Sequence, residues 1–411
     1  MIHYPLRLLI VFALLAQWLA AQPVQDLRLT YRSSIDDTDQ RYRVYVPSSY
    51  RPGEPIPVAL LLHGTNHDEN TFFEDERRYP AKNGVKYAAE KSGILAVVPY
   101  ARGNTDFRGI GETDVFCVLA DVKQRFTVDE ERIYLTGHSM GGHGSAYLGF
   151  HHPDLFAAAA PLAAAYGFSW LAGSAQHLPF LWVGGEKDEE YYRVGVAAAV
   201  DRMKRLNYPV QFVELPGEDH FGPVKDFDRV FQWLRQHRRV AHPESFTFEV
   251  DTPLHRRAYW ITVETIAEPG KVAVVKARAD ADNTARLELD NVAAISVWPD
   301  PHVFRAERAL EVYIEDRSVF SGELPASHEV VLARNAAGWT AVKRPRRELP
   351  LTAYRTNPVA FAPESLDMDG TEARLANWIT DAMRSATGAD VALYCRAAYR
   401  GLPIPAGTVD V

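Results

Sequence analysis

The chain has 411 residues, of which 47% are hydrophobic and 24% are charged, which excludes a wholly disordered or fibrous protein. Its 45 basic and 53 acidic side chains give a net charge of −8, so no overall positive field exists to attract nucleic acid. The length is sufficient for two or three domains, each with its own core.

An export signal is predicted at the start of the chain, over residues 1–21. Arg7 precedes an apolar run at 8–15, and the small residues Ala20 and Ala21 follow, which is the order typical of a secretory signal. The run is shorter than the roughly 20 residues of a membrane-spanning helix. We expect cleavage near Ala21, no membrane span in the mature chain and a secreted or periplasmic protein, the alternative being an uncleaved anchor.

An α/β domain is predicted over residues 26–240, where short apolar runs alternate with helical stretches. Segments 27–32 and 41–46 alternate apolar and polar residues, as an antiparallel pair does. Between later runs, the spacing over 113–126 is helical. Near-continuous apolar runs suit strands buried on both faces of a doubly wound, mostly parallel sheet. These runs are at 58–62, 94–99, 133–136, 156–161, 180–183 and 210–215.

A β-sandwich domain is predicted over residues 245–342, because short strand-like runs there are separated by turns and not by helices. The runs are at 246–250, 259–263, 272–277, 285–289, 310–314 and 330–333. A basic stretch at 343–347 is expected to be a solvated linker. It leads to a third segment at 348–411, in which Leu375, Trp378, Ile379 and Met383 share one face of a predicted helix.

The clearest chemical motif surrounds Ser139. Gly137 and Gly141 stand two residues before and after it, between a predicted strand and a helix-compatible segment. A serine on such a sharp turn projects its hydroxyl above the sheet, and the tight backbone requires small flanking residues. The alternative is a glycine-rich turn with an ordinary capping serine.

A serine nucleophile needs a base and an acid, and the sequence offers both in the order acid then histidine. Asp188 and His220 each follow a predicted parallel strand, at the edge where open α/β sheets place their sites. We expect Asp188 to orient His220, and His220 to act as general base and acid. The alternatives are a helix cap for Asp188, a solvent-exposed loop residue for His220, and a different acid among Glu186, Glu189 and Asp219.

An oxyanion hole is predicted beside Ser139. The strand at 58–62 ends in His63 and Gly64, and the backbone N–H of Thr65 can join that of Met140 in facing a tetrahedral oxyanion. His63 is expected to brace this loop. His67 and His138 are expected to pack or to line the substrate site.

With these motifs, residues 26–240 resemble the secreted bacterial α/β-hydrolase esterases, which are related to prolyl-oligopeptidase-like peptidases, polyhydroxybutyrate depolymerases and feruloyl esterases. The resemblance implies a serine hydrolase that cleaves carboxylic esters of small molecules or polymers, without a cofactor or a metal. A serine peptidase is the alternative. The region at 245–342 is similar to the accessory β-domains of such hydrolases.

The end of the chain carries a second, partial resemblance. Residues 372–383, 387–393 and 402–407 are similar to the opening of the C-terminal domain of 5′-nucleotidases, but of that family's nucleotide-site motif only Arg400 is present. This resemblance implies a rival class, a metal-dependent phosphoesterase, for which Asn66, His67 and Asp68 match only one element. A non-catalytic envelope- or polysaccharide-binding protein is a third class.

Only two cysteines occur, Cys117 and Cys395. We expect both to be ordinary buried thiols, with a disulfide between them as the alternative. The sequence does not determine the oligomeric state.

Overall fold

The structure is a computed structural model that describes residues 25–75, 77–347, 360–362 and 407–409. The predicted export signal and most of the predicted third segment, including Arg400 and Cys395, lie outside the described residues. Within that segment, β19 (Ala360–Ala362) pairs antiparallel with β20 (Gly407–Val409). The described part of the chain contains no helix that is both long and apolar enough to cross a membrane.

Eight strands form one sheet in the first part of the chain, in the order β1-β2-β4-β3-β5-β6-β7-β8. β2 pairs antiparallel with β1 and β4, and the remaining neighbours are parallel, which confirms the predicted opening pair and mostly parallel sheet. The strands are β1 (Gln25–Arg32), β2 (Asp39–Val46), β3 (Ile56–Leu62), β4 (Leu95–Pro99), β5 (Val128–His138), β6 (Ala158–Leu162), β7 (Phe180–Gly185) and β8 (Val210–Leu215).

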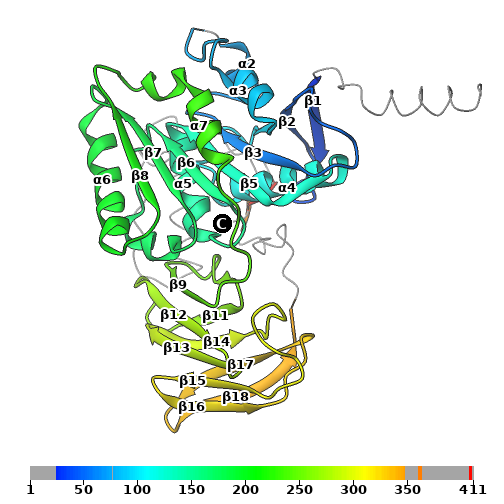
Figure 1. The fold of residues 1–411 in the computed structure, drawn as a ribbon, viewed down its shortest axis with the longest axis vertical. Coiled ribbons are helices and arrows are strands. Elements are labelled where there is room, and N and C mark those ends of the chain that lie inside the picture. The colour runs from blue at the N-terminus through cyan, green and yellow to red at the C-terminus, as the bar shows by residue number, and fades with distance from the viewer. Residues whose placement is uncertain (1–24, 76, 348–359, 363–406, 410–411) are drawn as a thin grey trace, which may run out of the picture.

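Helices cover both faces of this sheet (Figure 1). Along β3, Val58 and Leu60 belong to a core cluster with α4, α5 and α6, whereas Ala59 and Leu61 belong to a second cluster with α3 and α7. Successive strand residues point to opposite faces, so β3 is apolar throughout because both faces are buried. The helices are α2 (Thr71–Glu74), α3 (Val85–Ser92), α4 (Ile110–Arg125), α5 (Met140–His151), α6 (Glu190–Arg205) and α7 (Phe227–Leu234), with 3-10 helices η1 (Ser169–Ala175) and η2 (Gly222–Lys225). Cys117, on α4, is half-buried and not buried as predicted.

Two five-stranded sheets follow, in the orders β16-β15-β13-β12-β9 and β10-β11-β14-β17-β18. Buried residues of both sheets, among them Phe248 of β9 and Ile295 of β14, belong to one hydrophobic cluster. The strands are β9 (Ser245–Val250), β10 (Arg257–Ala258), β11 (Ile261–Ile266), β12 (Ala273–Asp280), β13 (Thr284–Asp290), β14 (Val292–Val297), β15 (Leu310–Ile314), β16 (Arg317–Gly322), β17 (His328–Asn335) and β18 (Gly338–Pro345). We call them the second β region.

The expectation of a linker at 343–347 is wrong. β18 continues to Pro345, and Arg344 donates to Glu329 at 2.6 Å and also bonds Glu264. Arg346 lies over the ring of Trp298, 3.3 Å from its centroid. The basic side chains of 343–347 therefore contact acidic and aromatic side chains of the two five-stranded sheets. A count of charges along the sequence does not reveal such contacts.

The second β region docks directly on the α/β part, below the large sheet in Figure 1. Glu249 of β9 is buried, and its carboxylate accepts from the backbone N–H of Gly173 at 2.8 Å and from Arg202 at 3.0 Å. A Cβ on Gly173 would lie 2.5 Å from that carboxylate, so the backbone of η1 approaches β9 closely. A buried charge held in this way ties the two parts together.

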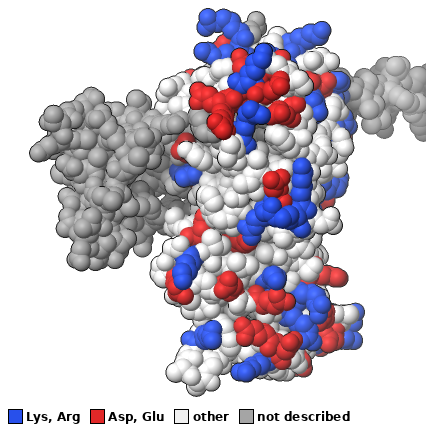
Figure 2. Space-filling view, turned by 90° about the vertical axis from the view of Figure 1, so that its left-hand side faces the viewer, with Lys and Arg blue, Asp and Glu red and all other residues white. Residues whose placement is uncertain are grey.

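Charged side chains of both signs are intermixed over the face shown in Figure 2, along both parts of the described structure. No continuous positive track crosses this face of the described residues. Such a surface does not favour binding of a phosphate backbone there.

Candidate active site

The backbone at Ser139 forms the sharp turn that the sequence predicts. β5 ends at His138, α5 begins at Met140, and Ser139 between them has φ 58° and ψ −114°. A non-glycine residue with positive φ is strained, and such strain is typical of functional turns. Gly141 is required because a Cβ there would lie 1.8 Å from the carbonyl oxygen of Leu62. The turn therefore presses against the end of β3 and leaves the half-buried Ser139 at the edge of the sheet.

Asp188 and His220 are brought together at the ends of the neighbouring parallel strands β7 and β8. His220 Nδ1 lies 3.0 Å from Oδ1 and 2.9 Å from Oδ2 of Asp188. Asp188 Oδ1 also accepts from the N–H of Glu189 at 2.9 Å, but Glu189 and not Asp188 is the N-cap residue of α6, so Asp188 does not cap that helix. Because Nδ1–H faces a carboxylate, Nε2 is the ring atom available to accept a proton.

The other candidate acids bind elsewhere. Glu186 accepts from the N–H of Gly217 at 2.6 Å, and Asp219 accepts from the N–H of Phe221 at 3.0 Å. Among the described side chains, Asp188 alone has a carboxylate bonded to the ring of His220.

His138 connects the serine turn to the histidine loop. Its Nε2 donates to the carbonyl oxygen of His220 at 2.9 Å, and its Nδ1 lies 3.1 Å from the hydroxyl of Tyr79. Burial lowers the pKa of His138 to about 3, so the ring is neutral and its single N–H goes to His220. No hydrogen bond joins Ser139 Oγ to the His220 ring within the described structure, and this bond commonly tightens only when substrate is present.

The His220 ring is enclosed by aromatic groups. Its centroid lies 4.9 Å from that of His138 and 4.4 Å from that of Tyr192, near the start of α6. Tyr79 and Tyr192 were not predicted from the sequence, because each contributes a single side chain from a segment without a motif.

The predicted oxyanion donors lie on adjoining segments. Met140 is the first residue of α5, where a backbone N–H has no acceptor within the helix. Thr65 follows Gly64, whose Cβ position would be 3.6 Å from the carbonyl oxygen of His138. The His63 ring, fully buried, reaches the carbonyl oxygen of Tyr100 at 3.0 Å, as expected of a brace, and His67 packs beside Gly64. The two N–H groups thus belong to segments in close contact.

Two groups of possible metal ligands exist among the described residues, although the sequence led us to expect none. They are Glu112 with His152 and His255, and His242 with Asp300 and His302. Neither includes Ser139, Asp188, His220 or the Asn66, His67 and Asp68 element. Each group includes a histidine from a distant part of the sequence, His255 or His242, so no local spacing revealed the whole group.

Comparisons with known proteins match the part of the chain that contains Ser139 and Asp188. Residues 117–211 match the family described as "Putative esterase". A bifunctional acetylxylan esterase/xylanase of Neocallimastix patriciarum is 31% identical over 154 residues, which are 36% of this chain and 21% of that protein. The chain thus spans about a fifth of this relative's length.

Solved structures with similar chains include hydrolases and esterases. The fluorophosphonate-binding serine hydrolase FphF of Staphylococcus aureus has a TM-score of 0.44 and 22% identity, over 52% of this chain and 99% of its own. The ferulic acid esterase AmCE1/Fae1A of Anaeromyces mucronatus has a TM-score of 0.43 and 19% identity, and the match covers 54% of this chain and 94% of that esterase. The predicted resemblance to esterases is confirmed by the family match, so the central segment of this chain, at 117–211, is similar to esterases.

Proposed function

We propose that the chain is an exported serine hydrolase that cleaves carboxylic esters through Ser139, His220 and Asp188. The observation that supports this most strongly is the placement of three groups at one sheet edge: a strained serine turn, and a histidine whose Nδ1 is bonded to a buried carboxylate at 2.9 Å. A serine hydroxyl becomes an effective nucleophile only beside such an oriented base.

In the first half of the proposed reaction, His220 Nε2 takes the proton of Ser139 Oγ as the oxygen attacks the ester carbonyl. The N–H groups of Thr65 and Met140 stabilise the oxyanion that forms. Asp188 stabilises the resulting imidazolium and fixes its orientation. His220 then gives its proton to the departing alcohol, which leaves an acyl group on Ser139.

In the second half, water replaces the alcohol. His220 takes a proton from water, the hydroxyl attacks the acyl group, and the proton returns to Ser139 as the acid departs. Every proton transfer therefore uses one nitrogen, His220 Nε2, while Nδ1 stays bonded to Asp188.

Aromatic side chains beside the triad support an ester that carries a ring, either a phenolic acid or a sugar. Tyr192 contacts His220, and the His143 ring lies 6.3 Å from Tyr192 and 4.9 Å from Tyr166. Tyr166 is 52% exposed. Exposed aromatic faces near a site favour stacking with flat or sugar rings. The acetylxylan esterase relative supports a polymer-linked ester.

We further propose that residues 1–21 direct export and that the second β region, at 245–345, is a β-sandwich accessory domain. One cluster shared by its two sheets supports the sandwich.

A substrate panel tests the proposed function. The full chain is assayed with p-nitrophenyl acetate, feruloyl sugars, acetylated xylo-oligosaccharides and chromogenic dipeptides. We expect ester turnover and no dipeptide cleavage. Faster cleavage of the dipeptides would instead establish the peptidase, and no turnover of any compound would favour the non-catalytic binding protein.

A further inference from the structure

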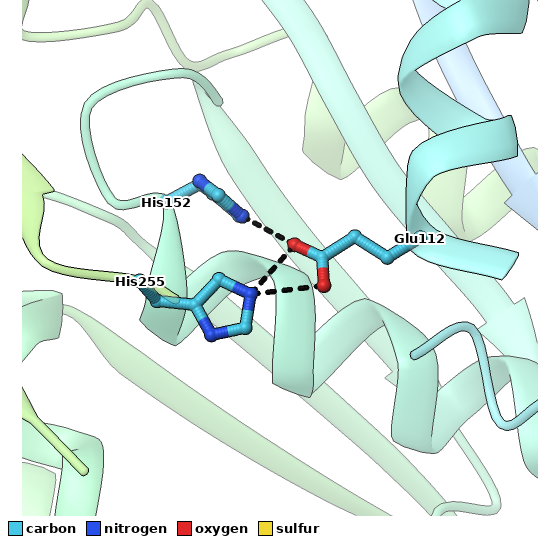
Figure 3. A group of neighbouring side chains, drawn as sticks. All are labelled: Glu112, His152 and His255. Carbon is cyan, nitrogen blue, oxygen red and sulfur yellow. Dashed lines mark hydrogen bonds and ion pairs between the residues drawn. The ribbon is translucent and has the colours of Figure 1, made fainter. Parts of the chain in front are cut away.

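Three side chains converge at a buried point between the α/β part and the second β region. His152 Nε2 lies 2.6 Å from Glu112 Oε1, and His255 Nε2 lies 2.9 Å from both carboxylate oxygens of Glu112 (Figure 3). Glu112 is 3% exposed, and the two histidines are 2% exposed. An ionised carboxylate is rarely placed in such a position without a compensating partner.

The three residues come from separate elements. Glu112 is in the first turn of α4, His152 follows the last residue of α5, and His255 lies between β9 and β10. The group therefore connects two helices of the α/β part with the second β region. α5 has 12 residues, and at 1.5 Å per residue its ends are about 18 Å apart. Since Ser139 precedes one end and His152 follows the other, the cluster is remote from the proposed reaction.

The donor set matches the chemistry of zinc. Two imidazole nitrogens and one carboxylate form a recurring protein ligand set for Zn²⁺. The potential ligand atoms all lie within 4.8 Å of one another. Zinc-to-ligand distances of about 2.0–2.2 Å place tetrahedral ligand atoms about 3.3 Å apart, so each histidine nitrogen needs to move away from the Glu112 carboxylate by only about half an ångström.

The electrostatics also suit a cation. The Glu112 carboxylate lies within hydrogen-bond distance of both rings, 2.6 Å from His152 and 2.9 Å from His255. A second carboxylate lies close by: Asp251 is 2.9 Å from His151 Nε2, and the His151 ring is 4.2 Å from that of His255. Two negative groups near one buried point offset the charge of a divalent ion.

We propose that Glu112, His152 and His255 bind one zinc-like divalent ion that fastens the second β region to the α/β part. In the absence of the ion, the Nε2 atoms of both rings face the Glu112 carboxylate. To bind the ion, each ring presents the Nε2 lone pair to the metal and carries its remaining proton on Nδ1. The site has a structural role and contributes nothing to ester chemistry.

The second group provides a matched control. His242 and His302 are exposed, and His242 Nδ1 lies 2.7 Å from Asp300. Asp300 also accepts from the N–H of His302 at 3.0 Å. Exposed imidazoles beside a carboxylate that already serves its own loop do not form an enclosed metal site.

The test uses the full chain without a histidine tag. It is stripped with chelator, dialysed against Zn²⁺ and analysed for metal content, and Co²⁺ is titrated while the visible absorption of four-coordinate cobalt is followed. We expect one ion per chain, a higher Tm with Zn²⁺ than with chelator, and displacement of Co²⁺ by Zn²⁺. Glu112→Gln and His255→Gln should lower the bound metal to near zero and abolish the Tm shift. The control, His242→Gln with His302→Gln, should keep both.

Several results would overturn the proposal. One is an unmodified chain that retains no stoichiometric metal and gives no cobalt spectrum, a result that does not depend on the folding of any variant. Equally decisive would be full metal retention by Glu112→Gln, or loss of metal only in the control. Ester turnover at 25 °C should be the same before and after chelation, so failure of the metal site and failure of the esterase proposal are distinguished.

Discussion

His220 turns its Nδ1 toward both carboxylate oxygens of Asp188, at 3.0 and 2.9 Å, while Asp188 also accepts the N–H of Glu189 at 2.9 Å. The carboxylate is thereby fixed from two sides, and the imidazole is held in one tautomer. We predict that Asp188→Asn lowers kcat by about 10⁴-fold, because the amide favours the wrong tautomer. Asp219→Asn, one residue from His220, should keep activity within a few-fold. Comparable losses in both variants would contradict the assignment of the acid.

Gly141 is the position where the serine turn tolerates no side chain. A Cβ there would lie 1.8 Å from Leu62 O, whereas a Cβ on Gly184 would meet its nearest neighbour, the Phe212 ring, at 3.9 Å. We predict that Gly141→Ala displaces the oxyanion loop, costs about 1–3 kcal/mol of unfolding free energy and removes most ester turnover. Gly184→Ala should change neither. Urea unfolding and steady-state kinetics measure both effects, and a fully active Gly141→Ala would show that the close approach is unimportant.

His138 should make stability depend on pH. Burial lowers its pKa to about 3 in the folded chain, whereas an imidazole in the unfolded chain titrates near about 6.5. Between these values the unfolded state binds the proton and the folded state does not. The free energy of unfolding therefore falls as the pH drops below about 6.5, by up to about 1.4 kcal/mol per pH unit for one such group.

This dependence is measured by urea denaturation at pH 7.5, 6 and 5. His138→Gln should show a smaller loss between pH 7.5 and 5, because the titrating ring is gone. His302 is exposed, so His302→Gln should lose as much free energy of unfolding between pH 7.5 and 5 as the unmodified chain does. Buried His63 and His151, whose pKa values burial also lowers, account for part of the remaining slope. An unchanged slope in His138→Gln would contradict this explanation.

Arg344 should stabilise the second β region. It bonds Glu329 at 2.6 Å and also contacts Glu264, and the side chains of these two acids are only 6% and 11% exposed. Arg344→Ala leaves two largely buried carboxylates with fewer partners, and we expect a loss of about 1–3 kcal/mol of unfolding free energy. The exposed Arg317→Ala should cost less than about 0.5 kcal/mol. Equal urea midpoints for the two variants would show that 343–347 acts as the solvated linker after all.

The sequence predicted the parts of the molecule that repeat a local pattern. Runs such as β3 are apolar at every position because both faces are buried, and Ser139 stands in a motif whose spacing reflects backbone crowding. β14 was missed because only Asn291 separates it from β13. β18 was misinterpreted because its basic residues suggested solvent, although Arg344 pairs with acids on β17 and β11 of the same sheet.

The pairing of Asp188 with His220 could be predicted from the sequence, because each residue follows a predicted strand. The side chains that pack around them could not. Tyr79 and Tyr192, which contact His138 and His220, carry no such signal. The Glu112, His152 and His255 group joins positions more than a hundred residues apart in its longest pair, so only the tertiary structure reveals it.

The central claim, that Ser139 is the nucleophile, is tested most directly by reacting the full chain with a fluorophosphonate and mapping the adduct by peptide mass spectrometry, alongside ester turnover by Ser139→Ala. We predict one adduct per chain, located on Ser139 and absent from the variant, with turnover lowered by about 10³- to 10⁶-fold. An adduct on another residue, or a Ser139→Ala chain that retains most of its ester hydrolysis, would contradict the account.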